Sequence, residues 1–263
     1  TGRLAWDREF ALVDSVGHVM RLQKHPKMTQ IVPRIQDDVM VVTAPGQPTL
    51  TVSLVGTTLT DPKQEENNNN NNNNLVKVCG NKCGGRVWGD SFVADWFSNF
   101  LGVPCWLARH VDGEYYIDGE RVPIKRPNEI AFANEDALLL ISHHAVERLN
   151  QVLVARGRRS RVHSRYFRPN LVVATTAKNK HVMENIEDDW ESLTIERTQL
   201  KLQTAGECSR CSMVDYDPST GTKGRTLSAL AEYRRRNGQI TFGIFLRRVA
   251  SGDQVTIQQG DVL

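Results

Sequence analysis

The feature that most restricts the fold of this chain is its succession of short apolar runs separated by turn residues, with few segments at helical spacing. Two such runs, at 39–45 and 49–55, flank the turn APGQP and are predicted to pair as a hairpin. The run at 10–22 has the same appearance, with its turn at 14–17. The second half of the chain adds runs typical of strands, at 136–142, 170–176, 192–204, 240–249 and 253–263.

One helix is predicted in the first half, from about 91 to 101. Asp90 or Ser91 can cap its start, and Gly102 can end it. Its apolar residues fall at helical spacing and are expected to face the core together: Phe92, Val93, Trp96, Phe97, Phe100 and Leu101.

Two further helices are predicted in the second half. One follows Ser142, which can cap it, and ends at Gly157. The other covers 226–238, with basic residues in its last turn and an Asn-Gly exit. Because strands dominate and the helices are not regularly interleaved with them, the sequence predicts an α+β fold. Its core is expected to be a β-barrel or mixed sheet with a few peripheral helices.

Residues 67–74 form an unbroken asparagine tract behind an acidic segment that contains proline. Such a tract has no apolar face to bury, so burial cannot offset the entropy lost on ordering it. A disordered surface loop is therefore predicted at about 61–75.

The composition limits the possible partners and the compartment. A formal net charge of +3 is too small to indicate bulk nucleic-acid binding. No apolar run approaches the roughly 18 residues that a membrane span needs. Five cysteines favour reduced thiols and a cytoplasmic location over a disulfide-stapled secreted scaffold. The chain opens at TGRLAWDREF without an initiator Met or a secretory signal, so we expect it to have lost an N-terminal part.

Cys208 and Cys211 lie three positions apart in GECSRCSMVD and allow several interpretations. They could join Cys79 and Cys83 in a four-thiolate zinc site, although the spacing of that second pair is looser than in a zinc ribbon. A thioredoxin-like dithiol is disfavoured, because its CxxC opens a helix whereas SMVDYDPSTG runs into a turn.

The third interpretation depends on the arginine between the cysteines, Arg210. A guanidinium beside a thiol stabilises the thiolate and offers donors to an anion. The segment RYFRPN adds Arg168, which Pro169 is expected to hold in an extended conformation. Asn170 supplies a donor and an acceptor for the edge of a heterocycle. One thiolate with arginines and an amide suits an anionic, metal-bearing organic cofactor better than a closed metal cage.

Four motifs that follow one another along the chain resemble those of a known family: FRPNLVV, DDWESLTI, CSRC and TLSALAEYRRRNGQITFGIFLRR. With RLAWDREFALVDSVGHVMRLQKHPKM, CGNKCGGRVWGDSFVADWFSNFLGVPC and NEIAFANEDALLLIS upstream, the chain closely resembles the C-terminal domain of eukaryotic molybdenum cofactor sulfurases, in the MOSC superfamily. The resemblance covers nearly the whole chain except the asparagine loop and the basic insert at 156–165. It implies a smaller, β-rich N-terminal MOSC subdomain at 1–110 and a MOSC domain at 111–263.

The resemblance also implies a function. In that family the C-terminal domain binds the molybdenum cofactor (molybdopterin), and a terminal oxo ligand on molybdenum is replaced by a sulfido ligand. The sulfur comes as a persulfide from a cysteine desulfurase domain that uses pyridoxal phosphate, and we expect that domain to lie outside this chain. The molybdenum hydroxylases xanthine dehydrogenase and aldehyde oxidase are the implied clients. Neither nucleic acid nor membrane is an expected partner.

The site residues follow from the same resemblance. FRPN and CSRC are shared with the mitochondrial amidoxime reducing component, where the second cysteine of CSRC ligates molybdenum. That position is Cys211, as the metal ligand or the carrier of the transferred sulfur. Arg210, Ser209, Arg168, Asn170 and, less closely, Arg8 in WDRE are implied contacts of the cofactor. Cys208 is either a helper thiol or a small buried residue.

Two alternative functions stay open. A stand-alone molybdenum reductase of the amidoxime-reducing type would share FRPN and CSRC, although LAEYRRRNGQITFG favours the sulfurase side. A zinc-ribbon module for nucleic acid would use the four paired cysteines and the arginine run at 156–168.

Overall fold

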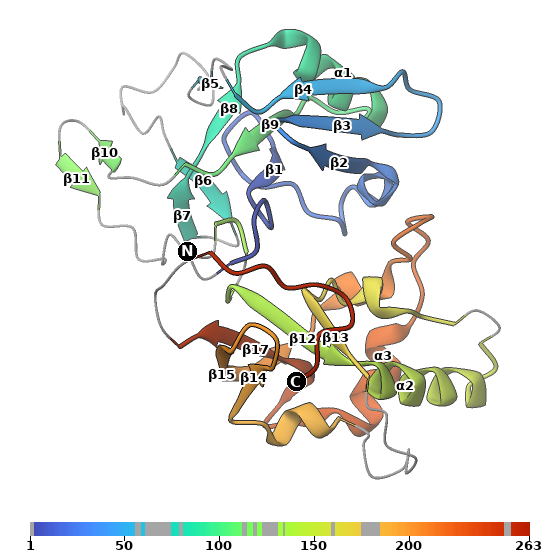
Figure 1. Cartoon of the computed structure of the whole chain (residues 1–263). Coiled ribbons are helices and arrows are strands. Elements are labelled where there is room, and N and C mark those ends of the chain that lie inside the picture. Colours follow the sequence, from blue (N-terminus) through green and yellow to red (C-terminus); the bar gives the residue numbers. More distant parts are fainter. Residues whose placement is uncertain are drawn as a thin grey trace. The chain divides into compact units, whose positions relative to one another are not determined.

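The structure is a computed structural model that describes residues 3–55, 59–60, 75–78, 81–111, 115–117, 120–122, 131–133, 135–158, 161–174, 185–249 and 254–263. These residues fall into two compact units (Figure 1). The N-terminal unit comprises Ala5–Glu135 and Ser219–Gly221. The C-terminal unit comprises Thr1–Leu4, Asp136–Pro218 and Thr222–Leu263.

The N-terminal unit is built of small antiparallel sheets. A four-stranded sheet has the order β1-β9-β8-β5 and a three-stranded sheet the order β2-β3-β4, while β6 pairs with β7 and β10 with β11. The strands are β1 (Phe10–Val13), β2 (Val32–Gln36), β3 (Val39–Thr43), β4 (Leu50–Ser53), β5 (Leu59–Thr60), β6 (Leu75–Val78), β7 (Asn81–Gly84), β8 (Arg86–Trp88), β9 (Trp106–Arg109), β10 (Tyr115–Ile117) and β11 (Glu120–Val122). Among the described residues of this unit, two helical segments accompany them, η1 (Pro26–Gln30) and α1 (Ser91–Leu101).

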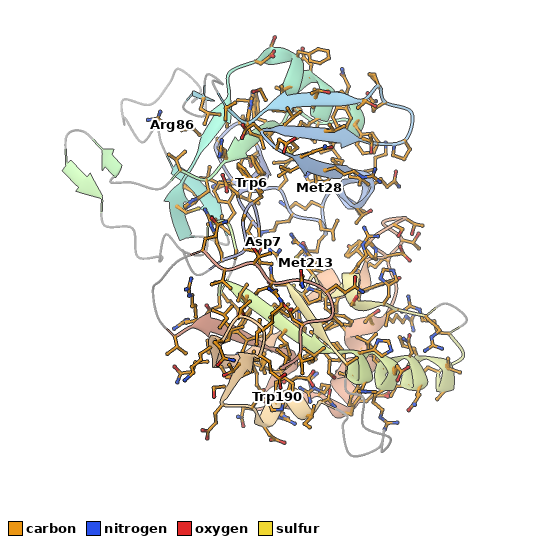
Figure 2. The ribbon with its side chains drawn as sticks, in the orientation of Figure 1. Trp6, Asp7, Met28, Arg86, Trp190 and Met213 are labelled. Atoms are coloured by element: carbon orange, nitrogen blue, oxygen red, sulfur yellow. The ribbon has the colours of Figure 1, made fainter. Side chains whose placement is uncertain are left out.

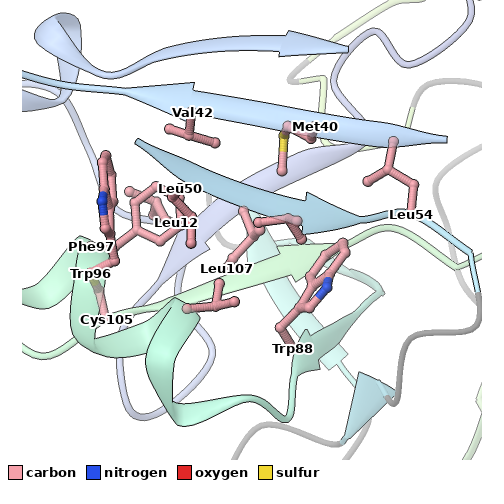
Figure 3. Packing of buried hydrophobic residues seen from close by; sticks show 12 residues of the cluster. Leu12, Met40, Val42, Leu50, Leu54, Trp88, Trp96, Phe97, Cys105 and Leu107 are labelled. Carbon is pink, nitrogen blue, oxygen red and sulfur yellow. The ribbon is translucent and has the colours of Figure 1, made fainter. Parts of the chain in front are cut away.

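The core of this unit lies between α1 and the strands, where alternate residues of β3 and β4 point inward (Figure 3). The hairpin predicted at 39–55 is confirmed, since Val39 of β3 pairs with Ser53 of β4. The Asp90 carboxylate accepts from the Phe92 N–H at 2.8 Å and caps α1, as predicted. Phe92 itself is 61% exposed, contrary to the expectation that it faces the core. At ~100° per residue its side chain lies at the edge of the apolar arc.

The C-terminal unit is built on one mixed sheet with the order β13-β12-β17-β15-β14, and β16 pairs with β17 at its side. Only β12 and β13 are parallel among these pairs. The strands are β12 (Leu138–Ser142), β13 (Leu171–Val173), β14 (Ser192–Ile195), β15 (Leu200–Ser209), β16 (Arg235–Arg236) and β17 (Gln239–Arg248). The helical segments are α2 (His143–Ala155), η3 (Ser164–Tyr166), η5 (Ile186–Asp189), η6 (Ser212–Asp215) and α3 (Thr226–Tyr233).

Helices α2 and α3 pack against each other in the core of this unit (Figure 1). The Ser142 hydroxyl accepts from the Ala145 N–H at 3.0 Å, which confirms the predicted cap of α2. Leu149 of α2, Leu230 of α3 and Phe242 of β17 are fully buried in one cluster. With three α-helices among the described residues and sheets as the main elements, the predicted α+β class is confirmed.

The third predicted helix is shorter than expected, because α3 ends at Tyr233. Asn237 and Gly238, at φ 48° and 79°, form the turn of a hairpin between β16 and β17. Asn-Gly favours this turn because both central residues need positive φ. The Arg234 guanidinium is 2% exposed and binds both carboxylate oxygens of Asp188, at 2.6 and 2.9 Å. These contacts, and not a helix dipole, fix the basic residues after α3.

The predicted last strand does not form in residues 254–263. A side chain holds this tail instead: Arg197 binds the Asp261 carboxylate at 2.5 and 2.8 Å and the Thr256 carbonyl at 2.8 Å. The predicted asparagine loop at about 61–75 lies outside the described residues except for Leu75. The domain boundary predicted at 110 and 111 falls inside the N-terminal unit and stays a prediction.

Two β-bulges, one on β15 and one on β17, interrupt the pairing of these two strands. Between the pairs Thr204–Leu246 and Gly206–Phe245 the extra residue is on β15. Between the pairs Glu207–Ile244 and Ser209–Thr241 the extra residue is on β17, where Gly243 has φ +79°. A bulge bends its strand and re-aims the side chains that follow it. The two bulges therefore set the direction in which the side chains at the end of β15 point.

We expect Gly243→Ala to destabilise the C-terminal unit strongly. A Cβ at this position would lie 2.5 Å from the Leu140 carbonyl oxygen and 2.6 Å from Ile141 Cγ2, in addition to the positive φ. Gly238→Ala is the matched control, because Gly238 has the same φ of +79° but no described atom within 4 Å of its Cβ position. The control should lose about 1 kcal/mol in urea unfolding and Gly243→Ala at least about 2 kcal/mol more. Equal losses would contradict the close approach of β12.

Glu187 is a fully buried carboxylate at the junction of β12 and α2. One of its oxygens accepts from the Ser142 N–H at 3.0 Å, and the other has no hydrogen-bond partner among the described residues. Burial, with a smaller contribution from the neighbouring Asp188, raises the pKa of Glu187 above its ordinary value of 4.5. The ionised form is therefore less stable in the folded chain than in the unfolded chain.

This raised pKa predicts a pH-dependent difference between the wild type and Glu187→Gln, which mimics the protonated form. The wild type has its full stability from this group below pH 4.5 and loses it as pH rises through the folded pKa. The free energy of unfolding of Glu187→Gln should therefore gain on the wild type above pH 4.5, by at most about 1.4 kcal/mol per pH unit. Urea unfolding between pH 4 and about 8 measures it. A constant difference would contradict the buried, ionisable carboxyl.

Candidate active site

The Arg168 segment, residues 161–170, is held near both of its ends by asparagine side chains, of which Asn150 is buried and Asn170 half-buried. Asn150 of α2 donates to the Val162 carbonyl and accepts from the Val162 N–H, both at 2.8 Å. At its other end, the Asn170 side-chain oxygen accepts from the Leu139 N–H at 2.9 Å, and the Asn170 N–H donates to the Leu139 carbonyl at 2.8 Å. Asn170 thereby starts β13 beside β12. Its predicted contact with a heterocycle stays a prediction.

Arg168 itself is exposed and has a left-handed backbone, with φ 55°. The extended conformation predicted from Pro169 is therefore wrong. The short helix η3 imposes the difference: it ends in a turn in which the Arg168 N–H binds the Arg165 carbonyl at 3.3 Å. A left-handed residue is a common way to end a helical turn, but the residue there is usually Gly or Asn.

The two cysteines of CSRC lie in different environments. Cys208 is on β15 and is 5% exposed. Cys211 is exposed and stands at the start of η6, with an extended backbone at φ −111° and ψ −179°. Ser209, between them, donates its hydroxyl to the Gln239 side-chain oxygen at 2.7 Å. Of these two cysteines, Cys211 is therefore the accessible nucleophile, and the role of Cys208 stays a prediction.

Arg210 joins this segment to the Arg168 segment. Its guanidinium donates twice to the Phe242 carbonyl, at 2.9 and 2.6 Å, and once to the Phe167 carbonyl, at 3.1 Å. It also lies 5.5 Å from the centre of the Phe167 ring, whose centre is 4.3 Å from that of the Phe242 ring, with the two rings tilted by 30°. The structure thus brings RPN and CSRC together as the sequence motifs suggest. The predicted contact of Arg210 with a cofactor stays a prediction, and the three hydrogen bonds given above go to backbone carbonyls.

Two acidic residues after Cys211 were not predicted from the sequence. The Asp215 carboxylate accepts from the Leu227 N–H at 2.7 Å, at the start of α3. The Asp217 carboxylate accepts from the hydroxyl of buried Tyr166 at 2.6 Å. Acidic residues in a turn are ordinary, and a partner 51 residues away in the chain leaves no local signal. Figure 2 labels Met213 of the same stretch, in η6.

Arg8 belongs to the N-terminal unit. It pairs with the carboxylate of Asp7, labelled with Trp6 in Figure 2. Trp6 and Arg8 both have positive φ, 64° and 56°. The Arg8 carbonyl accepts from the Phe132 N–H at 3.0 Å, which fixes this irregular turn. Backbone strain of this kind clusters at functional sites.

Of the four cysteines that could together form a zinc site, three lie among the described residues: Cys83, Cys208 and Cys211. Cys79 lies outside them, and Cys83 is buried, with its thiol 3.3 Å from the Val76 carbonyl. Cys105 is also buried, and burial raises the pKa of its thiol. Over the described ranges, no group of three or more His, Cys, Asp and Glu is arranged to hold a metal ion. The same ranges contain no helix with the length and apolarity of a membrane span.

The chemistry that this arrangement permits is the binding of an anion beside an accessible thiol. The charged side chains exposed on the described part of the Arg168 segment are arginines: Arg161, Arg165 and Arg168. Guanidinium groups suit phosphate, and a soft thiolate suits a transition metal. Cys211 and the arginines therefore match a group that carries both a phosphate and a soft metal.

Comparison with known proteins gives two family matches. Residues 1–104 match the MOSC N-terminal beta barrel domain, and residues 127–263 match the MOSC domain. A molybdenum cofactor sulfurase of Neosartorya fischeri is 34% identical over 98% of this chain, and one of Aspergillus fumigatus is 33% identical over 98%. The chain spans 35% of the length of each of these two relatives. A solution structure from Bordetella bronchiseptica covers 39% of this chain and 71% of its own, at 17% identity and a TM-score of 0.29, which does not indicate a shared fold.

The left-handed backbone of Arg168 gives a test on stability. Arg168→Ala and Arg168→Gly both remove the side chain, so their difference isolates the backbone. We expect the glycine variant to be more stable by about 1 kcal/mol, because only glycine adopts φ 55° without strain. The same pair of changes at Arg165, inside η3, is the control and should give the opposite order. Urea unfolding measures all four variants, and the same order at both sites would contradict the left-handed turn.

Proposed function

The chain belongs to the family of MOSC domain proteins, and we propose that it binds the molybdenum cofactor and takes part in its sulfuration. The observation that carries this proposal is the bond from the guanidinium of Arg210, next to the exposed Cys211, to the carbonyl of Phe167, next to the exposed Arg168. The names of the similar proteins support a sulfurase and not a reductase.

The residues present fit the cofactor by their chemistry. Arg168 would bind its phosphate, and the Cys211 thiolate would meet its soft metal. Arg210 would hold these two segments in place, since three of its hydrogen bonds go to backbone carbonyls. Ser209, Asn170, Cys208 and Arg8 are further proposed contacts. When bound, the cofactor would supply a molybdenum centre that could take a sulfur ligand in place of a terminal oxygen ligand.

The activity of the longer proteins is proposed in the same way. Sulfur would reach this chain as a persulfide from a cysteine desulfurase domain that uses pyridoxal phosphate. The exposed position of Cys211 suits it to receive sulfur from another domain, because a thiol must be accessible for exchange. Molybdenum hydroxylases would receive the sulfurated cofactor, and the cytoplasm is the proposed location.

The test is the pair Cys211→Ala and Cys208→Ala, with retention of molybdopterin and sulfuration in a reconstituted system as the two measurements. We expect Cys211→Ala to lose at least about 90% of both, which corresponds to a tenfold loss of affinity or rate. Cys211 is exposed, so unfolding in urea should be unchanged within about 0.5 kcal/mol. The same two assays of Cys208→Ala measure how much the buried thiol contributes to cofactor retention and to sulfuration. Full retention by Cys211→Ala would overturn the assignment.

A further inference from the structure

The Arg168 segment and the Cys211 segment, residues 208–217, are joined by a second contact besides Arg210. The hydroxyl of Tyr166 donates to the Asp217 carboxylate at 2.6 Å. Tyr166 stands two residues before Arg168, and Asp217 stands six residues after Cys211. We propose that Tyr166 and Asp217 are positioning residues, whose hydrogen bond sets the placement of Arg168 relative to Cys211 that cofactor binding requires. This inference rests on the proposed function.

The bond is of a strong kind. Tyr166 is 4% exposed, and hydrogen bonds from a hydroxyl to a carboxylate are short and charge-assisted. Burial, followed by the hydrogen bond to Asp217 and its charge, raises the pKa of Tyr166 to about 12. The phenol therefore keeps its proton and remains a donor throughout the physiological range of pH.

Both partners are themselves held in place. The Tyr166 ring meets His163 edge-on, with ring centres 5.1 Å apart. The Asp217 N–H donates to the Thr222 carbonyl at 2.9 Å. The Arg158 guanidinium also acts on the Tyr166 hydroxyl, and Arg158 itself donates to the buried Thr226 hydroxyl at 3.1 Å. A bond between two such fixed groups transmits a change in one segment to the other.

Two contacts fix the relative orientation of the two segments, which one contact alone would leave free. Arg210, just after the end of β15, holds the Phe167 carbonyl, and Tyr166, one residue earlier, is held by Asp217 from beyond η6. A single bond fixes a distance but permits rotation about it. Bonds at successive residues also fix the orientation of the turn that follows, in which Arg168 stands at φ 55°.

Tyr166→Phe tests the inference because it removes only the hydroxyl. In the full chain we expect molybdopterin to bind about tenfold more weakly, measured by fluorescence titration at a temperature well below unfolding. Hydrogen exchange of the apo protein, read by mass spectrometry, should rise in peptides covering 161–170 and 208–217. Tyr233→Phe, at a half-buried tyrosine of α3, is the control and should change neither measurement.

A merely structural role would give a different result. It would lower the melting temperature of Tyr166→Phe and leave the affinity for molybdopterin unchanged. A double-mutant cycle with Asp217→Ala separates the two roles, because a shared hydrogen bond makes the two losses of affinity non-additive. Asp217→Asn keeps a carbonyl oxygen as acceptor and should recover part of the affinity lost in Asp217→Ala. Additive losses without such recovery would overturn the inference.

Failure of the inference is distinguishable from failure of the proposed function. If the wild-type chain does not bind molybdopterin, the proposed function falls and this inference falls with it. If the wild type binds and Arg168→Gly does not, while Tyr166→Phe binds like the wild type, only the positioning role of Tyr166 and Asp217 is overturned.

Discussion

The connection between the CSRC and FRPN segments of the C-terminal unit depends first on one interaction, the contact of the Arg210 guanidinium with two backbone carbonyls. The Phe242 carbonyl belongs to the bulged part of β17, and the Phe167 carbonyl belongs to the turn before Arg168. A planar guanidinium can bind both at once because its donors are fixed relative to one another. Without it, two acceptors would lose their donor and the two motifs would lose a direct connection. Arg210 therefore acts as a structural centre, whatever else it binds.

The interior of this unit also contains charged groups that a simple apolar core would exclude. Arg234 and Asp188 form a pair in which the side chains are 2% and 4% exposed. Buried ion pairs of this kind contribute little net stability but strongly disfavour arrangements in which either partner is left alone. The pair holds η5 and the start of the β16–β17 hairpin in one arrangement. Specific geometry in this unit is thus obtained by polar contacts, and the apolar core supplies most of the driving force.

Sequence patterns predicted the elements that local interactions determine. The limits of α1, the cap at Ser142 and the hairpin at 39–55 depend on residues within a few positions of one another. The grouping of RPN with CSRC was predicted from the chemistry of their side chains and from a resemblance, not from spacing. The left-handed Arg168, the burial of Arg234 and the Tyr166–Asp217 bond could not be predicted, because each depends on a partner or a turn set by tertiary packing. Phe92 shows that periodicity alone does not determine whether an apolar residue at the edge of a helical arc is buried.

The two bulges between β15 and β17 have a consequence for how such a chain can change length. One extra residue stands on each strand, so pairing beyond both bulges returns to its earlier register. Loss of the extra residue of β15 alone would exchange the inward and outward faces of the residues that follow it on this strand. Cys208 would then turn toward solvent. Among related proteins, insertions and deletions in these two strands should therefore occur together, as a coupled pair.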